Sequence, residues 1–194
     1  MSGPFDEAED ATPLTPSERS GLIPSHITTR GELNELEQRN ILDADRWAFG
    51  RRRDVLSEPF LRNLHRRMFG QVWRWAGKYR ASERNLGIES YRIATELAQL
   101  LGDMQYAVAH ESYPPDEIAV RFHHRLVSIH PFPNGNGRWS RLAADLLAVR
   151  LGRSRFTWGR TNLQAAGDVR RQYIEALRTA DNHDVAVLVV FARS

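Results

Sequence analysis

The chain has 194 residues, of which 41% are hydrophobic and 26% are charged, with 27 Lys and Arg residues against 24 Asp and Glu residues. This length and composition are typical of one globular domain with its own hydrophobic core. The absence of cysteine excludes disulfide scaffolds, thiol catalysis and cysteine-ligated metal centres. Lys78 is the sole lysine and is not part of a Gly-x-x-x-x-Gly-Lys motif, so a P-loop is also excluded.

The net charge of +3 is small, and acidic and basic residues alternate along most of the chain, which is typical of solvated helix faces. Charge alone therefore does not indicate a nucleic-acid-binding protein. No apolar run reaches the roughly 18–20 residues that a membrane-spanning helix needs. The acidic N-terminus also lacks the basic and apolar pattern of a signal peptide, so we expect a cytoplasmic protein without membrane contact.

Two parts of the chain differ in composition. Residues 1–24 contain four prolines and an acidic cluster, and they lack a periodic apolar pattern, which predicts an N-terminal tail. Residues 25–194 are predicted to form the folded domain.

Apolar residues at helical spacing dominate the domain. They predict helices at about 30–49, 57–74, 92–109, 137–151, 163–179 and 184–192. A further helix is predicted to start at Pro114-Pro115-Asp116 and to carry apolar residues as far as Ile129. Residues 78–91 break this period with polar residues and a short β-prone stretch, which predicts a loop or a small β-hairpin between helices. The predicted fold class is all-α with this one excursion.

The residues from His130 to Arg141 concentrate the candidate chemistry. His130 ends an apolar helix and is the residue type best suited to accept a proton near neutral pH. Residues 134–137 read Asn-Gly-Asn-Gly before a new helix, where backbone N–H groups favour an anion. Arg138 and Arg141 lie one helical turn apart and can bind phosphate oxygens. The segment therefore predicts a general base beside an anion-binding loop, which suits phosphoryl or nucleotidyl transfer.

This segment resembles the signature of the Fic domain family, His-x-Phe-x-Asp/Glu-Gly-Asn-Gly-Arg-x-x-Arg. Seven of the eight specified positions match, and Asn134 is the exception. The resemblance continues in residues 64–77 and 180–188 and covers about residues 30–191. The pattern is most similar to small bacterial Fic proteins called mobile mystery protein B.

The resemblance implies a Fic-fold helical bundle that transfers AMP from ATP to a Ser, Thr or Tyr hydroxyl of a target protein. His130 would be the catalytic base, and Phe132 would anchor the loop. Nucleotide binding would fall to Asn134, Gly135, Asn136, Gly137, Arg138 and Arg141. The target protein would dock by strand-like pairing at residues 78–91, here called the flap. Its centre would be Arg84, Asn85, Leu86, Gly87 and Ile88.

The family usually has Asp or Glu at the position of Asn134, where the carboxylate binds Mg²⁺. An amide oxygen carries no charge, so we expect weaker metal binding, with ATP phosphates supplying most of the ligands. Gly137 differs from the Lys of the Doc-type variant, which transfers phosphate.

Many family members contain an inhibitory motif, Ser/Thr-x-x-x-Glu-Gly/Asn, whose Glu pairs with the second signature Arg. Thr28 to Glu32 matches the first five positions, and Leu33 departs from the final Gly or Asn. This match would make the helix at 30–49 inhibitory through contact of Glu32 with Arg141. Thr29 and Glu32 also fit a capping box, which explains the same Glu structurally. The two interpretations are compatible.

Two other functions stay open. Asn134 keeps open a Fic-fold transferase of another nucleotide or of phosphate. A non-catalytic helical regulator is the third interpretation, with a helix-turn-helix DNA-binding protein as partner, because the resembled group tends to be encoded beside one. Oligomer formation is open as well.

Overall fold

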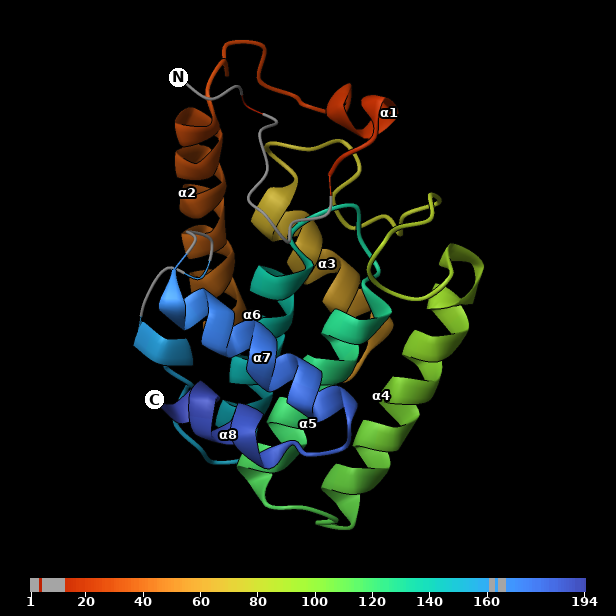
Figure 1. The fold of residues 1–194 in the computed structure, drawn as a ribbon, viewed down its shortest axis with the longest axis vertical. Coiled ribbons are helices and arrows are strands. Elements are labelled where there is room, and N and C mark those ends of the chain that lie inside the picture. Colours follow the sequence, from red (N-terminus) through yellow and green to blue (C-terminus); the bar gives the residue numbers. More distant parts are fainter. Residues whose placement is uncertain (1–3, 5–12, 161–162, 164–166) are drawn as a thin grey trace.

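A computed structural model of the chain describes residue 4 and residues 13–160, 163 and 167–194. Helices make up most of this described part, and none of its residues lies in a β-strand (Figure 1). The α-helices are α1 (Pro16–Arg19), α2 (Arg30–Phe49), α3 (Glu58–Phe69), α4 (Ile93–Ala109), α5 (Pro115–Ile129), α6 (Asn136–Arg150), α7 (Asp168–Asp181) and α8 (Ala186–Arg193). Two short 3-10 helices, η1 (Ser90–Arg92) and η2 (Trp158–Arg160), precede α4 and α7. The all-α prediction is confirmed.

Helices α5 and α6 pack against each other at the centre of the molecule. Pro115 occupies the first turn of α5, where its missing N–H removes no helical hydrogen bond. Phe122 and Leu126 lie one turn apart on the buried face of this helix and are fully buried. The α5–α6 pair therefore holds the connection between the two helices, residues 130–135, against the core.

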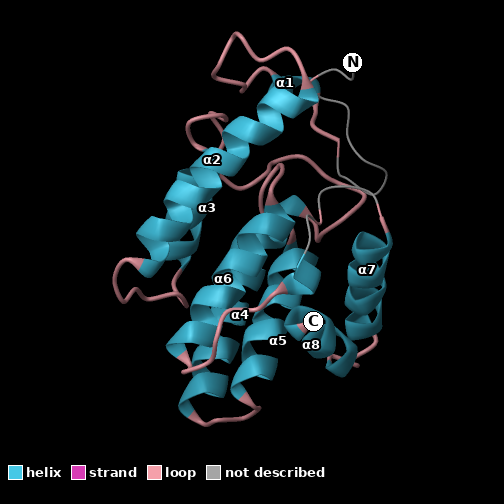
Figure 2. Ribbon diagram, turned by 90° about the vertical axis from the view of Figure 1, so that its left-hand side faces the viewer, coloured by secondary structure: helices cyan, strands magenta, loops and turns pink. Residues whose placement is uncertain are grey.

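The other helices surround this central pair. Helices α2 and α3 pack together on one flank, α4 packs on α5, and α7 and α8 pack together beside α5 (Figures 1 and 2). None of the helices in the described ranges is both long and apolar enough to cross a bilayer.

The predicted helices agree with the observed ones in number and order from residue 30 onward. The second helix ends at Phe69 rather than near 74, because Gly70 caps it and residues 71–77 form turns. Residues 164–166 of the sixth predicted helix lie outside the described residues, and α7 begins at Asp168. Asp184 lies one residue before Val185, the N-cap of α8, and its Oδ1 accepts from the N–H of Ala186 at 3.1 Å.

Residues 78–91 form an irregular loop, so of the two predicted forms the loop is confirmed and the hairpin is wrong. Its carbonyl groups do not pair across two strands. Those of Ser82 and Ile88 instead accept hydrogen bonds from the buried guanidinium of Arg80. One long side chain thus replaces the hydrogen-bond ladder of a hairpin.

The described part of the predicted tail, from residue 13, packs on the domain. Leu14 is buried in the core, and Leu22 forms an antiparallel bridge with Trp73. The short helix α1, which the sequence analysis did not predict, lies between them. Residues 1–3 and 5–12 of the tail lie outside the described residues.

Candidate active site

A cavity of about 600 Å³ lies where the α5–α6 connection meets the flap, the start of α2 and helix α7. Ten of the residues predicted from the signature and the flap line it, namely His130, Asn134, Gly135, Asn136, Gly137, Arg138, Arg141, Asn85, Leu86 and Gly87. Arg84 and Ile88 of the predicted flap centre do not line the cavity, and neither does Glu32.

His130 is the C-cap of α5 and adopts a left-handed backbone conformation with φ 53° and ψ 59°. Pro131 follows and prevents continuation of the helix. Burial, together with the positive charges of Arg80 and Arg84, lowers the pKa of His130 to about 4, while a hydrogen bond to the backbone of Val127 opposes this shift. The imidazole is therefore neutral at pH 7 and able to accept a proton.

The side chain of Asn136 holds the loop between α5 and α6 in shape. Its Oδ1 accepts from the N–H of Phe132 at 3.0 Å, and its Nδ2 donates to the carbonyl of the same residue at 2.8 Å. Phe132 is fully buried, as expected for an anchor. Gly135 has φ +80°, and a Cβ there would lie 2.6 Å from the ring of Phe69, so this turn requires glycine. The side chain of Asn136 therefore forms hydrogen bonds within the loop, which leaves its backbone to contact a ligand.

His65 on α3 supports the loop between α5 and α6. This role was not predicted from the sequence. Its Nε2 lies 3.0 Å from the carbonyl oxygen of Asn134, and its Nδ1 accepts from the N–H of Gly77 at 3.0 Å. Its ring stacks on Phe132 with 3.7 Å between centroids. Burial lowers the pKa of His65 to about 3, so the neutral ring donates on one side and accepts on the other.

Arg138 is held from two sides. Its Nη1 donates to Oε2 of Glu37 on α2 at 2.6 Å, and its Nη2 donates to Oδ1 of Asn134 at 3.3 Å. The Glu37 side chain is 4% exposed, and its Oε1 also accepts from Nε1 of Trp73 at 2.7 Å. The helix predicted to be inhibitory therefore reaches the first signature arginine.

Glu37 could have been found in the sequence from helical spacing. It shares one stripe of α2 with Leu33, Asn40 and Ala44, and all four are buried. An acidic side chain on a buried stripe needs a buried partner, and a nearby signature arginine is such a partner.

The proposed contact of Glu32 with Arg141 is not present in the described structure. Oε2 of Glu32 accepts from the backbone N–H groups of Thr28 and Thr29 at 2.9 and 3.0 Å, which completes the capping box of α2. These bonds turn the carboxylate toward the helix start, so the structure shows the predicted capping contact of Glu32 and not its contact with Arg141.

Arg141 is positioned by α7. Its guanidinium lies 5.4 Å from the ring centroid of Tyr173, whose hydroxyl lies 2.9 Å from Nε2 of His123. Burial raises the pKa of Tyr173 and holds the pKa of His123 well below its usual value. A neutral pair thus supports the second signature arginine at the cavity wall.

The flap lies directly against the α5–α6 connection. Arg80 donates from Nε to the carbonyl of His130 at 2.7 Å, and its N–H donates to the carbonyl of Pro131 at 2.9 Å. Gly87 has φ +93°, and a Cβ there would lie 2.5 Å from Cβ of His130. The flap therefore touches the candidate base through a position that only glycine fills.

The described cavity-lining residues do not fit a protein-held Mg²⁺ ion. Mg²⁺ prefers carboxylate oxygens and an octahedral set of hard ligands. Among these lining residues Asp181 is the one carboxylate, and its Oδ1 lies 2.7 Å from Nε2 of His124. The amide oxygen of Asn134 accepts from Arg138 instead. No group of three His, Cys, Asp or Glu side chains suited to a metal occurs within the described ranges.

One cavity of this helical bundle brings together a neutral histidine, a glycine-rich helix N-terminus and two arginines. These groups suit the binding of an anion and the acceptance of a proton. Comparison with known proteins identifies the class of this site. A model described as the Fic/DOC family matches residues 55–148. Residues 55–148 therefore form a Fic/DOC family domain.

The curated relatives agree with this family. Protein adenylyltransferase Fic of Drosophila grimshawi is 31% identical over 132 residues, which cover 66% of this chain and 26% of that protein. The chain thus spans about a quarter of the length of such curated relatives.

Two solved structures share the fold. A fragment of Fic-1 from Caenorhabditis elegans has a TM-score of 0.66 at 24% identity and covers 90% of this chain and 51% of that one. BepC of Bartonella tribocorum, solved with bound AMPPNP, has a TM-score of 0.68 at 18% identity and covers 92% of this chain and 97% of that one. The finer resemblance to mobile mystery protein B stays a prediction.

Proposed function

We propose that this protein transfers AMP from ATP to a hydroxyl group of a target protein. The proposal rests on one observation. A neutral His130, the glycine-rich loop, Arg138 and Arg141 line the same cavity. The names of the curated relatives and the AMPPNP in BepC support an adenine nucleotide as donor. Cytoplasmic location and a target docked at the flap stay part of the proposal.

The chemistry assigned to the residues is a single displacement. The target hydroxyl attacks the α-phosphorus of ATP while His130 accepts the hydroxyl proton. The new bond joins the target oxygen to phosphorus, and the bond from the α-phosphorus to the bridging oxygen breaks. Pyrophosphate leaves with the electron pair. The backbone N–H groups at the start of α6 and the two arginines stabilise negative charge on the phosphates.

Magnesium enters this proposal only as MgATP. Among the described cavity-lining residues the one carboxylate, Asp181, contacts His124, so the ion would be held by the phosphates and by water. The weaker protein contribution follows from the amide at position 134.

We further propose that Glu37, rather than Glu32, restrains the enzyme in its resting state. Its carboxylate occupies Arg138, a group that an incoming phosphate would otherwise bind. The Glu37 carboxylate and a phosphate anion would bind the same guanidinium group, so they compete directly for Arg138. Release of Arg138 from Glu37 would therefore raise nucleotide affinity.

Intact-mass analysis after incubation with ATP and Mg²⁺ tests the proposal, with self-modification as the readout while the target is unidentified. The variants are wild type, Glu37→Gln and Glu37→Gln with His130→Ala. Expected is a gain of one AMP in Glu37→Gln that disappears when His130 is replaced. A gain of phosphate mass would instead favour the second candidate function, a phosphate transferase. Asn134, which departs from the family signature, is the residue that supports this candidate. No gain in any variant, together with no ATP binding, would contradict both activities and favour a non-catalytic regulator.

A further inference from the structure

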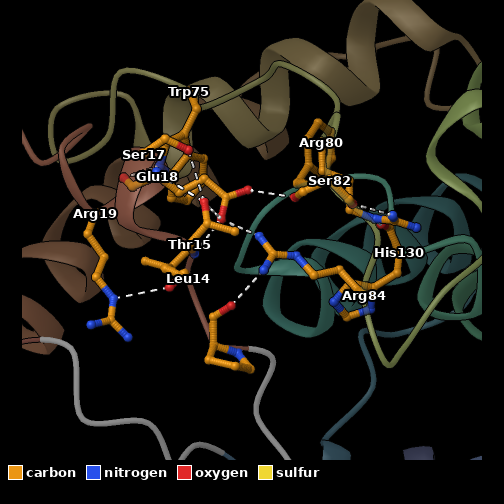
Figure 3. Close-up of polar contacts among 12 residues, drawn as sticks. Leu14, Thr15, Ser17, Glu18, Arg19, Trp75, Arg80, Ser82, Arg84 and His130 are labelled. Carbon is orange, nitrogen blue, oxygen red and sulfur yellow. Dashed lines mark hydrogen bonds and ion pairs between the residues drawn. The ribbon is translucent and has the colours of Figure 1, made fainter.

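The segment before α2 contacts the flap as well as the core. Residues 13–23, here called the N-terminal strap, lie beside the flap although more than 50 residues of sequence separate them. Figure 3 shows Glu18 of α1, Arg84 and Ser82 of the flap, and His130 in one region of the structure. The contacts among these residues connect the start of the described chain with the neighbourhood of the candidate base.

The strap is fixed to the domain by its backbone. The N–H of Ile23 donates to the carbonyl of Val72 at 2.8 Å, and the N–H of Arg74 donates to the carbonyl of Gly21 at 2.9 Å. Nε1 of Trp75 donates to the carbonyl of Glu18 at 3.1 Å. The strap is therefore anchored to residues 72–75, and the Glu18 side chain extends from it to the flap.

The carboxylate of Glu18 binds two flap residues. Arg84 donates from Nη2 to Oε2 of Glu18, and Ser82 donates from Oγ to Oε1 at 3.2 Å. The side chains of Glu18 and Arg84 are 12% and 6% exposed, so this ion pair is shielded from water. Nη1 of Arg84 also donates to the carbonyl of Pro13 at 2.7 Å. Both ends of the guanidinium are thus held by the strap.

The same flap residues continue to the candidate base. The carbonyl of Ser82 accepts from Arg80, and Arg80 donates to the carbonyl of His130. Arg84 and Arg80 both contribute positive charge that lowers the pKa of His130. The flap is irregular and has no ladder of its own, so its shape depends on these side-chain bonds.

We propose that Glu18 is a positioning residue that sets the flap over the cavity through Arg84 and Ser82. This inference rests on the proposed function, because the flap is where the target would dock. Without the Glu18 carboxylate, Arg84 loses an ionic partner in a shielded site, and the flap adopts several conformations. The strap thereby fixes the position of the flap surface on which the target hydroxyl would be presented.

Tryptic cleavage of the full-length protein after Arg84 measures flap position without any assay of activity. Trypsin must bind the arginine side chain, which the strap covers in the wild type. In Glu18→Gln we expect cleavage after Arg84 to accelerate by about tenfold, while cleavage after exposed Arg39 of α2 stays unchanged. Glu35→Gln is the matched control, because this exposed carboxylate pairs with Arg39 on α2.

A second readout separates positioning from general stability. In a Glu37→Gln background, which provides measurable transfer, Glu18→Gln is expected to lower the self-modification rate about tenfold and change ATP affinity by less than about twofold. Glu18→Asp, which keeps the charge, should recover part of the rate. Equal losses in rate and ATP affinity would overturn the positioning role.

The possible outcomes distinguish failure of the proposed role of the strap from failure of the proposed function. Unchanged cleavage after Arg84 in both Glu18→Gln and Ser82→Ala would overturn the role of the strap, whether or not AMP is transferred. Faster cleavage along the whole chain in both variants would also overturn it, since it would show general unfolding. Selective release of the flap in a protein that transfers no nucleotide would support the strap and contradict the proposed function alone.

Discussion

Oε2 of Glu37 lies 2.6 Å from Nη1 of Arg138, so a buried carboxylate of α2 occupies the first arginine of the signature. Glu37→Gln removes the charge but keeps an oxygen that accepts from Trp73, so the fold should persist. We expect ATP affinity to rise about tenfold, because one competing ionic contact is lost. Calorimetric titration with ATP measures this change.

Glu35→Gln is the control for this titration, since Glu35 is an exposed residue of the same helix. It should leave ATP affinity unchanged. An affinity in Glu37→Gln equal to that of the wild type would show that the Glu37–Arg138 pair does not restrain nucleotide binding.

The pH dependence of transfer should reflect the low pKa of His130. Burial lowers this pKa to about 4, and below it the protonated imidazole cannot accept a proton. The acidic limb of the rate profile should therefore have its midpoint near 4, with little change between about pH 5.5 and 7.5. Rates of self-modification measured over this range check the prediction, and a midpoint near the ordinary histidine value of about 6.5 would contradict it.

Gly87→Ala should damage activity through the contact of the flap with the candidate base. The new Cβ would lie 2.5 Å from Cβ of His130 at a φ of +93°, so flap and base must move apart. We expect a loss of transfer rate of about a hundredfold. Gly102→Ala is the matched control, because a Cβ at this α4 position meets nothing within 4 Å, and it should stabilise the protein by about 0.5–1 kcal/mol. Equal activity of the two variants would disprove the role of Gly87.

His65→Leu should destabilise the phosphate-binding loop. The substitution leaves the carbonyl of Asn134 and the N–H of Gly77 without the ring that joins them. We expect a loss of about 2–4 kcal/mol in the free energy of unfolding, measured by urea denaturation at pH 7. A loss below about 0.5 kcal/mol would contradict the bridging role.

Acid should destabilise the wild type through the same residue. The pKa of His65 is depressed to about 3 in the folded protein, so between about pH 6.5 and 3 the unfolded chain binds the extra proton. The contribution of neutral His65 is therefore complete above about pH 6.5 and is lost progressively as the pH falls. The stability of His65→Leu should depend less on pH over this interval.

Asn134→Asp should make transfer less demanding of magnesium. A carboxylate at this position adds a hard, charged ligand beside the phosphate loop. We expect the Mg²⁺ concentration for half-maximal self-modification to fall several-fold, with Glu35→Gln as an unchanged control. An unchanged Mg²⁺ requirement would show that the side chain at position 134 does not face the ion.

Sequence reasoning predicted the features that depend on neighbouring residues. The helices followed from periodic apolar positions such as Phe122 and Leu126, and the loop from 130 to 137 followed from its prolines and glycines. The candidate site was predicted in one piece because its base, loop and arginines are contiguous in the chain.

The supporting contacts could not be predicted in this way. Glu37, His65 and Arg80 reach the site from α2, α3 and the flap, and the packing of the helices determines which groups they meet. The hairpin prediction failed for the same reason. Local β-propensity does not show that the buried Arg80 would donate hydrogen bonds to the flap carbonyls. Glu32 matched a motif, but its nearest donors were the amides of its own helix start.

The most direct test of the central claim compares two labels of ATP. Glu37→Gln is incubated with Mg²⁺ and ATP labelled at either the α- or the γ-phosphate, with the His130→Ala double variant in parallel. The account predicts stable incorporation of the α label, no incorporation of the γ label, and loss of incorporation when His130 is replaced. Incorporation of the γ label alone, or α labelling that persists without His130, would contradict it.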